Sequence, residues 1–204
     1  MAERPRSSAR RPWIKDLASI GIAAAVVLVG RSSLADHYHV PSESMLPTVV
    51  VNDHILVNKA AYGVRVPFSH VTLAELAGPS RGDVVVLESP ESGIVLLKRV
   101  VAGPGDTVAV RDGQLLLDGK PVPTESKDGA VTEALGHGHG LRLDDGGGPD
   151  FGPVKVPEGQ YLVLGDNRGN SRDGRYFGLV KREAILGRAV AILTRNGSPT
   201  WISL

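Results

Sequence analysis

The apolar residues of this chain form one long run near the N-terminus and many short runs after it. Residues 17–30 carry no charge, and the run extends over residues 14–34 if its three charged residues lie near a membrane interface. Basic residues precede the run. The positive-inside rule therefore predicts a cytoplasmic tail over residues 1–15, a transmembrane anchor over residues 16–34 and an extracytoplasmic remainder over residues 35–204.

Two other interpretations of this run stay open. It can be a buried core helix, or it can be a cleavable signal peptide, because Ser33-Leu34-Ala35 fits the small-x-small cleavage pattern. The arginines at residues 10–11 weakly resemble a twin-arginine signal. We expect an uncleaved anchor, because it would hold Ser44, nine residues after Ala35, at the membrane surface.

Beyond residue 48 the apolar runs are short and bounded by turn residues, which is typical of strands. The Asp-Gly pairs at residues 112–113 and 118–119 are hairpin dipeptides, whereas residues 62–79 show no regular pattern. Residues 123–153 are poor in apolar residues and rich in Gly and Asp, and they are predicted to form a long loop or insertion. The chain is therefore expected to be mainly β, with a β-barrel or sheet domain behind a single N-terminal transmembrane helix. Strands are expected over residues 53–59, 84–87 and 94–102, within 107–121, and over 161–164, 185–193 and 201–202.

Composition narrows the classes of function. The net charge is +1 and aromatic residues make up 4% of the chain, which argues against a nucleic-acid partner. The absence of cysteine excludes disulfides, a thiol nucleophile and thiolate metal sites. His137 and His139 lie in the Gly-rich segment without a metal-ligand spacing, so we expect them to be exposed to solvent and expect no metal.

Residues 41–48 place two serines between two prolines, which makes a stiff, extended or turn-like segment. Such a segment can be a plain linker, or it can present a serine hydroxyl in a fixed direction. A serine becomes a nucleophile only beside a base, and a lysine serves as that base when burial lowers its pKa towards neutrality. Lys98 lies on an apolar strand face, and Lys59 is a rival on another. Either could be an ordinary lysine at a strand end, and spacing alone does not choose between them.

Four segments, in this order, resemble the motif boxes of type I signal peptidases. They are residues 42–48 (Ser-Glu-Ser-Met-Leu-Pro-Thr), 52–59, 81–106 and 165–178. The second has Asn52 where a glycine is usual. The resemblance implies a membrane-bound serine protease that removes signal peptides from secretory preproteins. By this match Ser44 is the nucleophile, Lys98 is its general base, and the Ser42 hydroxyl forms an oxyanion hole with the Ser44 N–H.

The last of these segments carries charged residues that the resemblance assigns to support. Ser171 would hydrogen-bond to the lysine and orient it. Asp173 and Arg175 would form an ion pair nearby, and Asp166 would help to hold the loop. Such a layer keeps the reacting side chains in place.

The sequence departs from the commonest pattern of the family at three positions. Glu43 stands where glycine is common, Gly169 where aspartate is frequent and Gly174 where serine is frequent. These are supporting positions, so the departures concern the fine geometry of the site rather than the serine and the lysine.

The substrate implied by the resemblance is an extended segment that pairs with an exposed strand edge. Small apolar pockets would select alanine-like side chains before the cut, and Met45, Asp83, Val84 and Val85 are the expected pocket residues. Membrane lipid is the other expected partner. No cofactor is expected.

Three rival functions fit parts of this pattern. A self-cleaving Ser–Lys peptidase of the repressor type would carry a DNA-binding domain and lack an anchor. A non-catalytic, membrane-tethered β module that binds exported chains would need no serine–lysine pair. A Ser–His hydrolase would use His54 or His70 as the base, and replacement of Lys98 would then be tolerated.

Overall fold

The structure is a computed structural model that describes residues 16–17, 19–22, 34–65 and 72–204. The described residues between 16 and 22 are helical. No helix in the described part of the chain is long and apolar enough to cross a membrane. The predicted tail and most of the predicted anchor lie outside the described residues, so the anchor stays a prediction.

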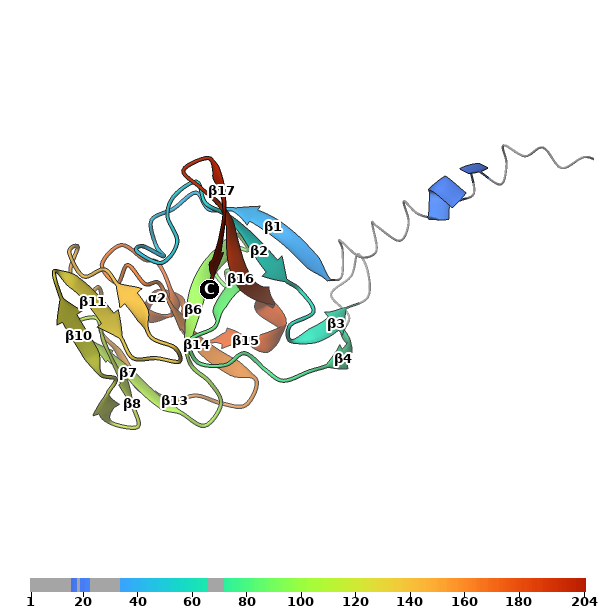
Figure 1. The fold of residues 1–204 in the computed structure, drawn as a ribbon. Helices are drawn as coiled ribbons and strands as arrows, with labels where there is room; N and C mark the ends of the chain where they lie inside the picture. The colour runs from blue at the N-terminus through green and yellow to red at the C-terminus, as the bar shows by residue number, and fades with distance from the viewer. Residues whose placement is uncertain (1–15, 18, 23–33, 66–71) are drawn as a thin grey trace, which may run out of the picture.

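The main sheet holds eight strands in the order β1-β2-β16-β5-β6-β14-β15, with β17 paired to β16. Every pairing in it is antiparallel, and Figure 1 shows the sheet curling around the core. This confirms the mainly β fold. The strands are β1 (Ala35–His39), β2 (His54–Asn58), β5 (Val84–Glu88), β6 (Val95–Ala102), β14 (Gln160–Leu164), β15 (Val180–Lys181), β16 (Ile185–Arg195) and β17 (Ser198–Ser203).

Smaller sheets complete the domain. One has the order β13-β7-β8-β9, one β10-β11-β12, and one pairs β3 with β4. In Figure 1, β10 and β11 lie at one end of the molecule, and β1 to β4 lie at the other. Their strands are β3 (Gly63–Arg65), β4 (Thr72–Glu75), β7 (Thr107–Arg111), β8 (Gln114–Leu117), β9 (Lys120–Pro121), β10 (Thr124–Lys127), β11 (Ala130–Glu133), β12 (His139–Leu141) and β13 (Phe151–Lys155). Two short helices, α2 (Gly174–Phe177) and the 3-10 helix η1 (Arg182–Ala184), lie between strands of the main sheet along the chain.

Strand β6 carries the chain from the surface into the core. Val95 is exposed, Leu96 and Leu97 are half-buried, and every residue from Lys98 onward is buried. The strand pairs with β5 and β14 along its two edges, and because consecutive residues of its second half are all buried, both faces are covered there. Lys98 is therefore the first residue of β6 that is fully removed from water.

The strands expected from periodicity are confirmed. Each expected range overlaps one observed strand, and residues 107–121 form β7, β8 and β9. Both Asp-Gly turns have positive φ at both residues, as the hairpin turn requires. Short apolar runs bounded by turn residues were a sufficient signal, because the runs of β5, β6 and β14 are buried at consecutive residues.

Residues 123–153 were expected to form a long loop or an insertion, and the loop is wrong: the segment contains β10, β11 and β12 and enters β13. The insertion stays a prediction. Only a few apolar side chains anchor the segment, among them the buried Leu135 and Leu141. Its other buried side chains, Glu133 and His139, are polar, and hydrophobic periodicity does not detect polar residues that find partners elsewhere in the fold.

Candidate active site

Ser44 and Lys98 meet at the centre of the site. The Lys98 Nζ lies 2.7 Å from the Ser44 Oγ and 2.9 Å from the Leu97 carbonyl oxygen. The serine is 8% exposed and the lysine 3%. Ser44 lies in a turn after β1, where the Leu46 N–H donates to the Glu43 carbonyl. A rigid turn and a central strand therefore hold the two side chains together across 54 residues of sequence.

The environment of Lys98 favours a neutral amine. Burial lowers the pKa of Lys98 to about 8, because the ammonium form loses its hydration. The carboxylates of Asp173 and Asp166 raise this pKa, whereas the guanidinium of Arg175 lowers it. Desolvation is the largest effect. The amine is thus able to take a proton near neutral pH, as a general base must.

The second serine of the turn is close to the first. The Ser42 Oγ lies 3.3 Å from the Ser44 Oγ, and Ser42 is exposed where Ser44 is buried. Asn167 fixes the backbone on the other side, since its N–H donates to the Ser44 carbonyl at 3.1 Å. The hydroxyl of Ser42 therefore borders the reacting oxygen without being enclosed.

An apolar pocket of about 210 Å³ opens beside Ser44 and Lys98. Met45 lines it, as expected. Asp83, Val84 and Val85 do not line it, which corrects that part of the prediction. Asp83 instead accepts from the Tyr62 hydroxyl at 2.8 Å, and the two valines are buried in the core. The lining residues are Tyr38, His39, Val40, Pro41, Ser42, Ser44, Met45, Ile55, Val86, Ile94, Val95, Leu96, Leu97 and Lys98.

A buried ion pair lies next to the lysine. Arg99 binds Asp166 through two bonds, from Nε at 2.9 Å and from Nη2 at 2.7 Å. The Thr48 hydroxyl also donates to this carboxylate, at 2.6 Å. Arg99 follows Lys98 in β6, and Thr48 ends the segment that carries Ser44. Asp166 therefore links the strand of the lysine to the turn of the serine.

A second buried ion pair closes the loop after β14. Asp173 accepts from Arg175 through both oxygens, each at 2.8 Å. The same carboxylate caps α2 and accepts from the Gly165 N–H at 2.9 Å. The pairing expected for Asp173 and Arg175 is present in the structure.

Ser171 differs from expectation. Its Oγ is buried and has no hydrogen-bond partner among the described residues, so the expected bond to Lys98 is not formed. The hydroxyl instead lies over Gly165, where a Cβ would come within 2.2 Å of it and within 2.5 Å of the Ser44 carbonyl oxygen. Close packing of the loop against the serine turn therefore requires glycine at residue 165.

The rival bases lie elsewhere. Lys59 is 3.8 Å from the Asp36 carboxylate, and His54 stands opposite His39 with ring centroids 5.3 Å apart. His70 falls outside the described residues. Spacing left Lys59 and Lys98 equivalent, and the fold separates them.

The two histidines of the Gly-rich segment differ in their exposure to solvent. His137 is exposed, but His139 is buried, so the expectation of exposure is wrong for His139. Burial lowers the pKa of His139 to about 4. Within residues 34–65 and 72–204, no three His, Asp or Glu side chains are arranged to hold a metal ion.

Sequence reasoning missed three buried charged residues of the site: Arg99, Glu133 and Arg168. Arg99 carried a weak signal, because it is a charge within an apolar strand and needs a partner if buried. Arg168 belongs to the charge-rich segment for which a supporting layer was expected, but it was given no role of its own, and Glu133 carried no signal. Their ion pair at 2.8 Å joins segments that only the fold brings together.

Comparisons with known proteins show the family of the chain. Residues 11–194 match the family model described as signal peptidase, peptidase S26. Over 93% of its length the chain is 33% identical to a signal peptidase I from Leptolyngbya laminosa, covering 82% of that protein. Over 82% of its length it is 38% identical to a signal peptidase I from Pseudomonas fluorescens, covering 67% of that protein. A crystal structure of a signal peptidase I from Enterococcus faecalis aligns with 57% of the chain and all of that chain, at 30% identity and a TM-score of 0.41. The chain belongs to the signal peptidase family, peptidase S26, and is a serine endopeptidase.

Proposed function

We propose that this chain removes N-terminal signal peptides from secretory preproteins, with Ser44 as nucleophile and Lys98 as general base. One observation carries the proposal: the buried Lys98 Nζ lies 2.7 Å from the Ser44 Oγ. The relatives named signal peptidase I supply the substrate class. Nucleophile and base within hydrogen-bond reach are the signature of an activated serine.

The reaction follows from the two protonation states of Lys98. The neutral amine takes the Ser44 proton as the hydroxyl oxygen attacks the scissile carbonyl. The resulting ammonium then protonates the leaving amine, which departs as the mature protein and leaves an acyl-enzyme. Lys98, neutral again, activates the water that hydrolyses this ester.

Negative charge on the substrate oxygen needs donors in the tetrahedral state. The Ser44 backbone N–H and the Ser42 hydroxyl are the proposed pair. The 3.3 Å separation of the two serine oxygens supports a position for Ser42 close to the reacting centre. Because Ser42 is exposed, its hydroxyl can turn towards the substrate when the substrate excludes water.

The pocket beside the serine supports a preference for small residues. Its volume of about 210 Å³ and its apolar lining suit short aliphatic side chains better than charged ones. Val86, Ile94 and Leu96 contribute to the wall. The substrate is proposed to lie extended along the exposed start of β6, with alanine-like side chains in the pocket.

We further propose that residues 16–34 anchor the chain in a membrane, with residues 1–15 in the cytoplasm and the catalytic domain outside. The excess of basic residues before the apolar run supports this orientation. β1 starts at Ala35, directly after the proposed anchor. Membrane lipid is thus the second proposed partner, and no cofactor is proposed.

The test is cleavage of a preprotein with an Ala-x-Ala site in detergent micelles. Ser44→Ala is expected to reduce kcat by at least about 10³-fold, and Lys98→Met by about 10²–10⁴-fold, the range of a lost general base. Lys59→Met is the matched control, since this lysine directly follows β2 and pairs with Asp36 rather than with Ser44, and it should leave kcat within about twofold.

Two results would contradict the proposal, provided that circular dichroism shows each variant folded. Cleavage that survives Lys98→Met but not Ser44→Ala would move the base to another residue. A folded parent chain that cleaves no preprotein would favour a module that binds exported chains without cutting them.

A further inference from the structure

Glu133 forms a buried ion pair far from its neighbours in sequence. It comes from β11 of the segment 123–153, is 0% exposed, and accepts from the Arg168 Nη2 at 2.8 Å. Arg168 is 1% exposed. Two charges so completely removed from water must be held for a structural or functional reason, because their desolvation costs about as much as their attraction returns.

Arg168 connects Glu133 to the loop beside Ser44 through further hydrogen bonds. Its Nε donates to the Gly165 carbonyl at 3.2 Å, and its Nη1 donates to the Gly113 carbonyl. Between Gly165 and Arg168 lies Asn167, whose N–H donates to the Ser44 carbonyl. Glu133 is thus three contacts away from the backbone of the proposed nucleophile.

The same segment supports this loop at its backbone. The Arg142 N–H donates to the Asp166 carbonyl at 2.9 Å, and the Arg168 N–H donates to the Arg142 carbonyl at 3.0 Å. Arg142 and Asn167 form an isolated parallel bridge. The Gly-rich segment therefore runs alongside the loop and continues the hydrogen bonding behind Ser44.

His139 fills the space between the two buried ion pairs. Its Nε2 lies 3.5 Å from the Glu133 Oε2 and 3.6 Å from the Asp166 Oδ1. Asp166 in turn binds Arg99, the neighbour of Lys98. Glu133 and Asp166 are therefore parts of one packed layer that reaches both the serine and the lysine.

We infer that Glu133 is a positioning residue for the reaction: through Arg168 it fixes the loop that holds the Ser44 backbone against Lys98. The inference rests on the proposed function, because it assigns Glu133 a role in aligning that pair. Proximity of the reacting atoms is effective only in a narrow range of geometry, so a loosened loop lowers the rate. Neither Glu133 nor Arg168 lines the pocket, so substrate binding is not expected to change.

The first test separates alignment from stability. Glu133→Leu combined with Arg168→Met replaces both charges by apolar side chains, a change that often leaves the stability of a protein unaltered or raised. It also removes the bonds from Arg168 to Gly165 and Gly113. We expect kcat to fall about 10- to 100-fold, with KM within about twofold of the parent and the melting temperature not lowered.

In the second variant we expect the opposite pattern, a lower melting temperature with a nearly unchanged kcat. Glu133→Gln keeps an acceptor oxygen for Arg168 but removes the negative charge, which leaves a buried guanidinium without its counter-ion. The melting temperature should fall, while kcat of the folded protein stays within about threefold of the parent. A purely structural role would leave kcat of the folded protein at the parental value in both variants, whatever the melting temperature.

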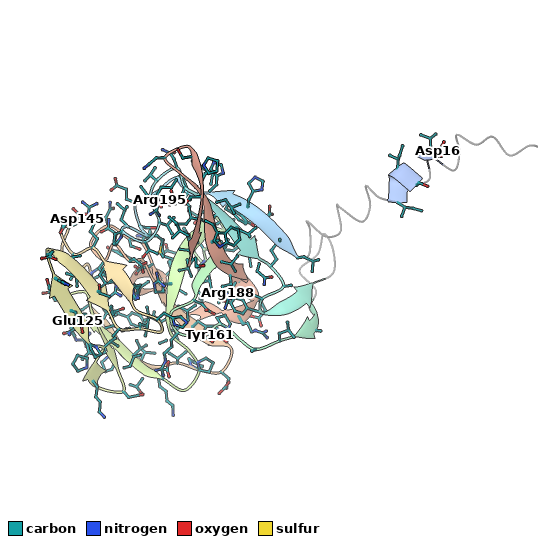
Figure 2. All side chains as sticks on the ribbon, viewed as in Figure 1. Asp16, Glu125, Asp145, Tyr161, Arg188 and Arg195 are labelled. Atoms are coloured by element: carbon teal, nitrogen blue, oxygen red, sulfur yellow. The ribbon has the colours of Figure 1, made fainter. Side chains whose placement is uncertain are left out.

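The matched control is Glu125→Gln. Glu125 belongs to β10 of the same segment, is exposed, and lies at the outer edge of the molecule in Figure 2. This variant should leave kcat, KM and the melting temperature unchanged. It controls for the loss of one carboxylate from the segment.

Each outcome decides the inference. A folded double variant with parental kcat would overturn it. If the double variant does not fold, Glu133→Leu alone decides: a kcat of the folded protein at least about tenfold below that of Glu133→Gln supports alignment, and equal kcat values overturn it. Ser44→Ala runs in the same assay. Cleavage that persists in Ser44→Ala would refute the proposed function itself, whereas Ser44-dependent cleavage with a fully active double variant refutes only the role of Glu133.

Discussion

The two sides of the Ser44–Lys98 pair are formed by different kinds of residues, apolar on one side and charged on the other. On one side lies the apolar pocket, whose wall comes from β1, β2, β5, β6 and the serine turn. On the other side lies a layer of buried ion pairs, Arg99–Asp166, Arg175–Asp173 and Arg168–Glu133. The first side is assembled from the main sheet, and the second from the loop after β14, the Gly-rich segment and Arg99 of β6.

The difference explains the protonation of the lysine. Burial removes water from the amine and lowers its pKa, while Asp173 and Asp166 from the ionic side raise it again. Their balance leaves the pKa of Lys98 at about 8. An apolar environment alone would lower the pKa further and weaken the base, because basicity falls with pKa. Burial therefore favours the neutral amine, and the carboxylates of the ionic side keep that amine basic.

The largest effect is expected from breaking the ionic side at Asp166. Asp166→Asn leaves the Arg99 guanidinium buried without a counter-ion, which should cost about 3–5 kcal/mol of unfolding free energy. For a domain of this size that corresponds to a fall of about 10 °C in the melting temperature, measured by calorimetry. Asp144→Asn is the control, because its ion pair with Arg142 is exposed. Equal melting temperatures for the two variants would show that the buried pair is not required.

The next effect has the opposite sign and depends on pH. Below pH 8 Lys98 is protonated in the folded and unfolded states, and folding must bury its charge; above pH 10.5 it is neutral in both. Between these values the unfolded state binds more protons, so the stability of the parent rises with pH. Lys98→Met should therefore stabilise the chain by about 3 kcal/mol at pH 7, a gain that vanishes above pH 10.5.

Urea unfolding of parent and Lys98→Met at several pH values measures this difference. Lys155→Met, at an exposed position of β13, is the control and should show no such dependence on pH. A gain that is constant from pH 7 to 11 would mean that burial does not disfavour the charge of Lys98.

A third effect tests the contact between the loop and the Gly-rich segment. A Cβ at Gly169 would lie 2.1 Å from the Asp145 carbonyl oxygen, so Gly169→Ala should cost about 2 kcal/mol through overpacking. The aspartate frequent in the family at this position would be worse. Gly103→Ala is the control, since a Cβ there meets Tyr161 at an ordinary 3.4 Å. Chemical denaturation of both variants checks the difference, and equal midpoints would contradict it.

Gly169 also illustrates what the sequence could and could not predict. The mainly β fold and both Asp-Gly hairpins followed from local patterns. The pairing of Ser44 with Lys98 followed from the resemblance, since spacing alone left Lys59 as a rival. The departure at Gly169 was visible but had no explanation, because its cause is the backbone of Asp145, which only the fold brings into contact.

The ionic side was the least predictable part. Apolar residues reveal burial by their period, but a buried Glu133 or Arg168 looks like an exposed one until its partner is known. The Gly-rich segment was therefore taken for a loop. The hydrogen bond predicted between Ser171 and Lys98 was wrong for a similar reason. The position of the Ser171 hydroxyl depends on packing over Gly165 rather than on its place in a motif.

A smaller effect is expected on the pocket side. Val86 is fully buried and lines the pocket, so Val86→Ala should cost about 1.5 kcal/mol while it widens the wall. The ratio of kcat/KM for valine over alanine at the cleavage site should rise about tenfold, the usual range for one or two methyl groups. Val84→Ala is the control, because Val84 is equally buried but lies outside the pocket. Val84→Ala should lose stability without a change in specificity. An equal change of specificity in both variants would mean that Val86 does not set the preference through the pocket wall.

The smallest effect is expected where the two sides touch at the surface. Arg172, from the loop after β14, binds Glu91, from the turn between β5 and β6, through two bonds at 2.8 and 2.9 Å. Its geometry matches that of the buried Arg99–Asp166 pair, but both partners are exposed, so water and salt screen the attraction. Arg172→Gln should therefore leave the melting temperature within about 2 °C and kcat/KM within about twofold. A larger loss that grows at low salt would mean that the surface link, and not only the buried layer, sets how the ionic side lies against the pocket.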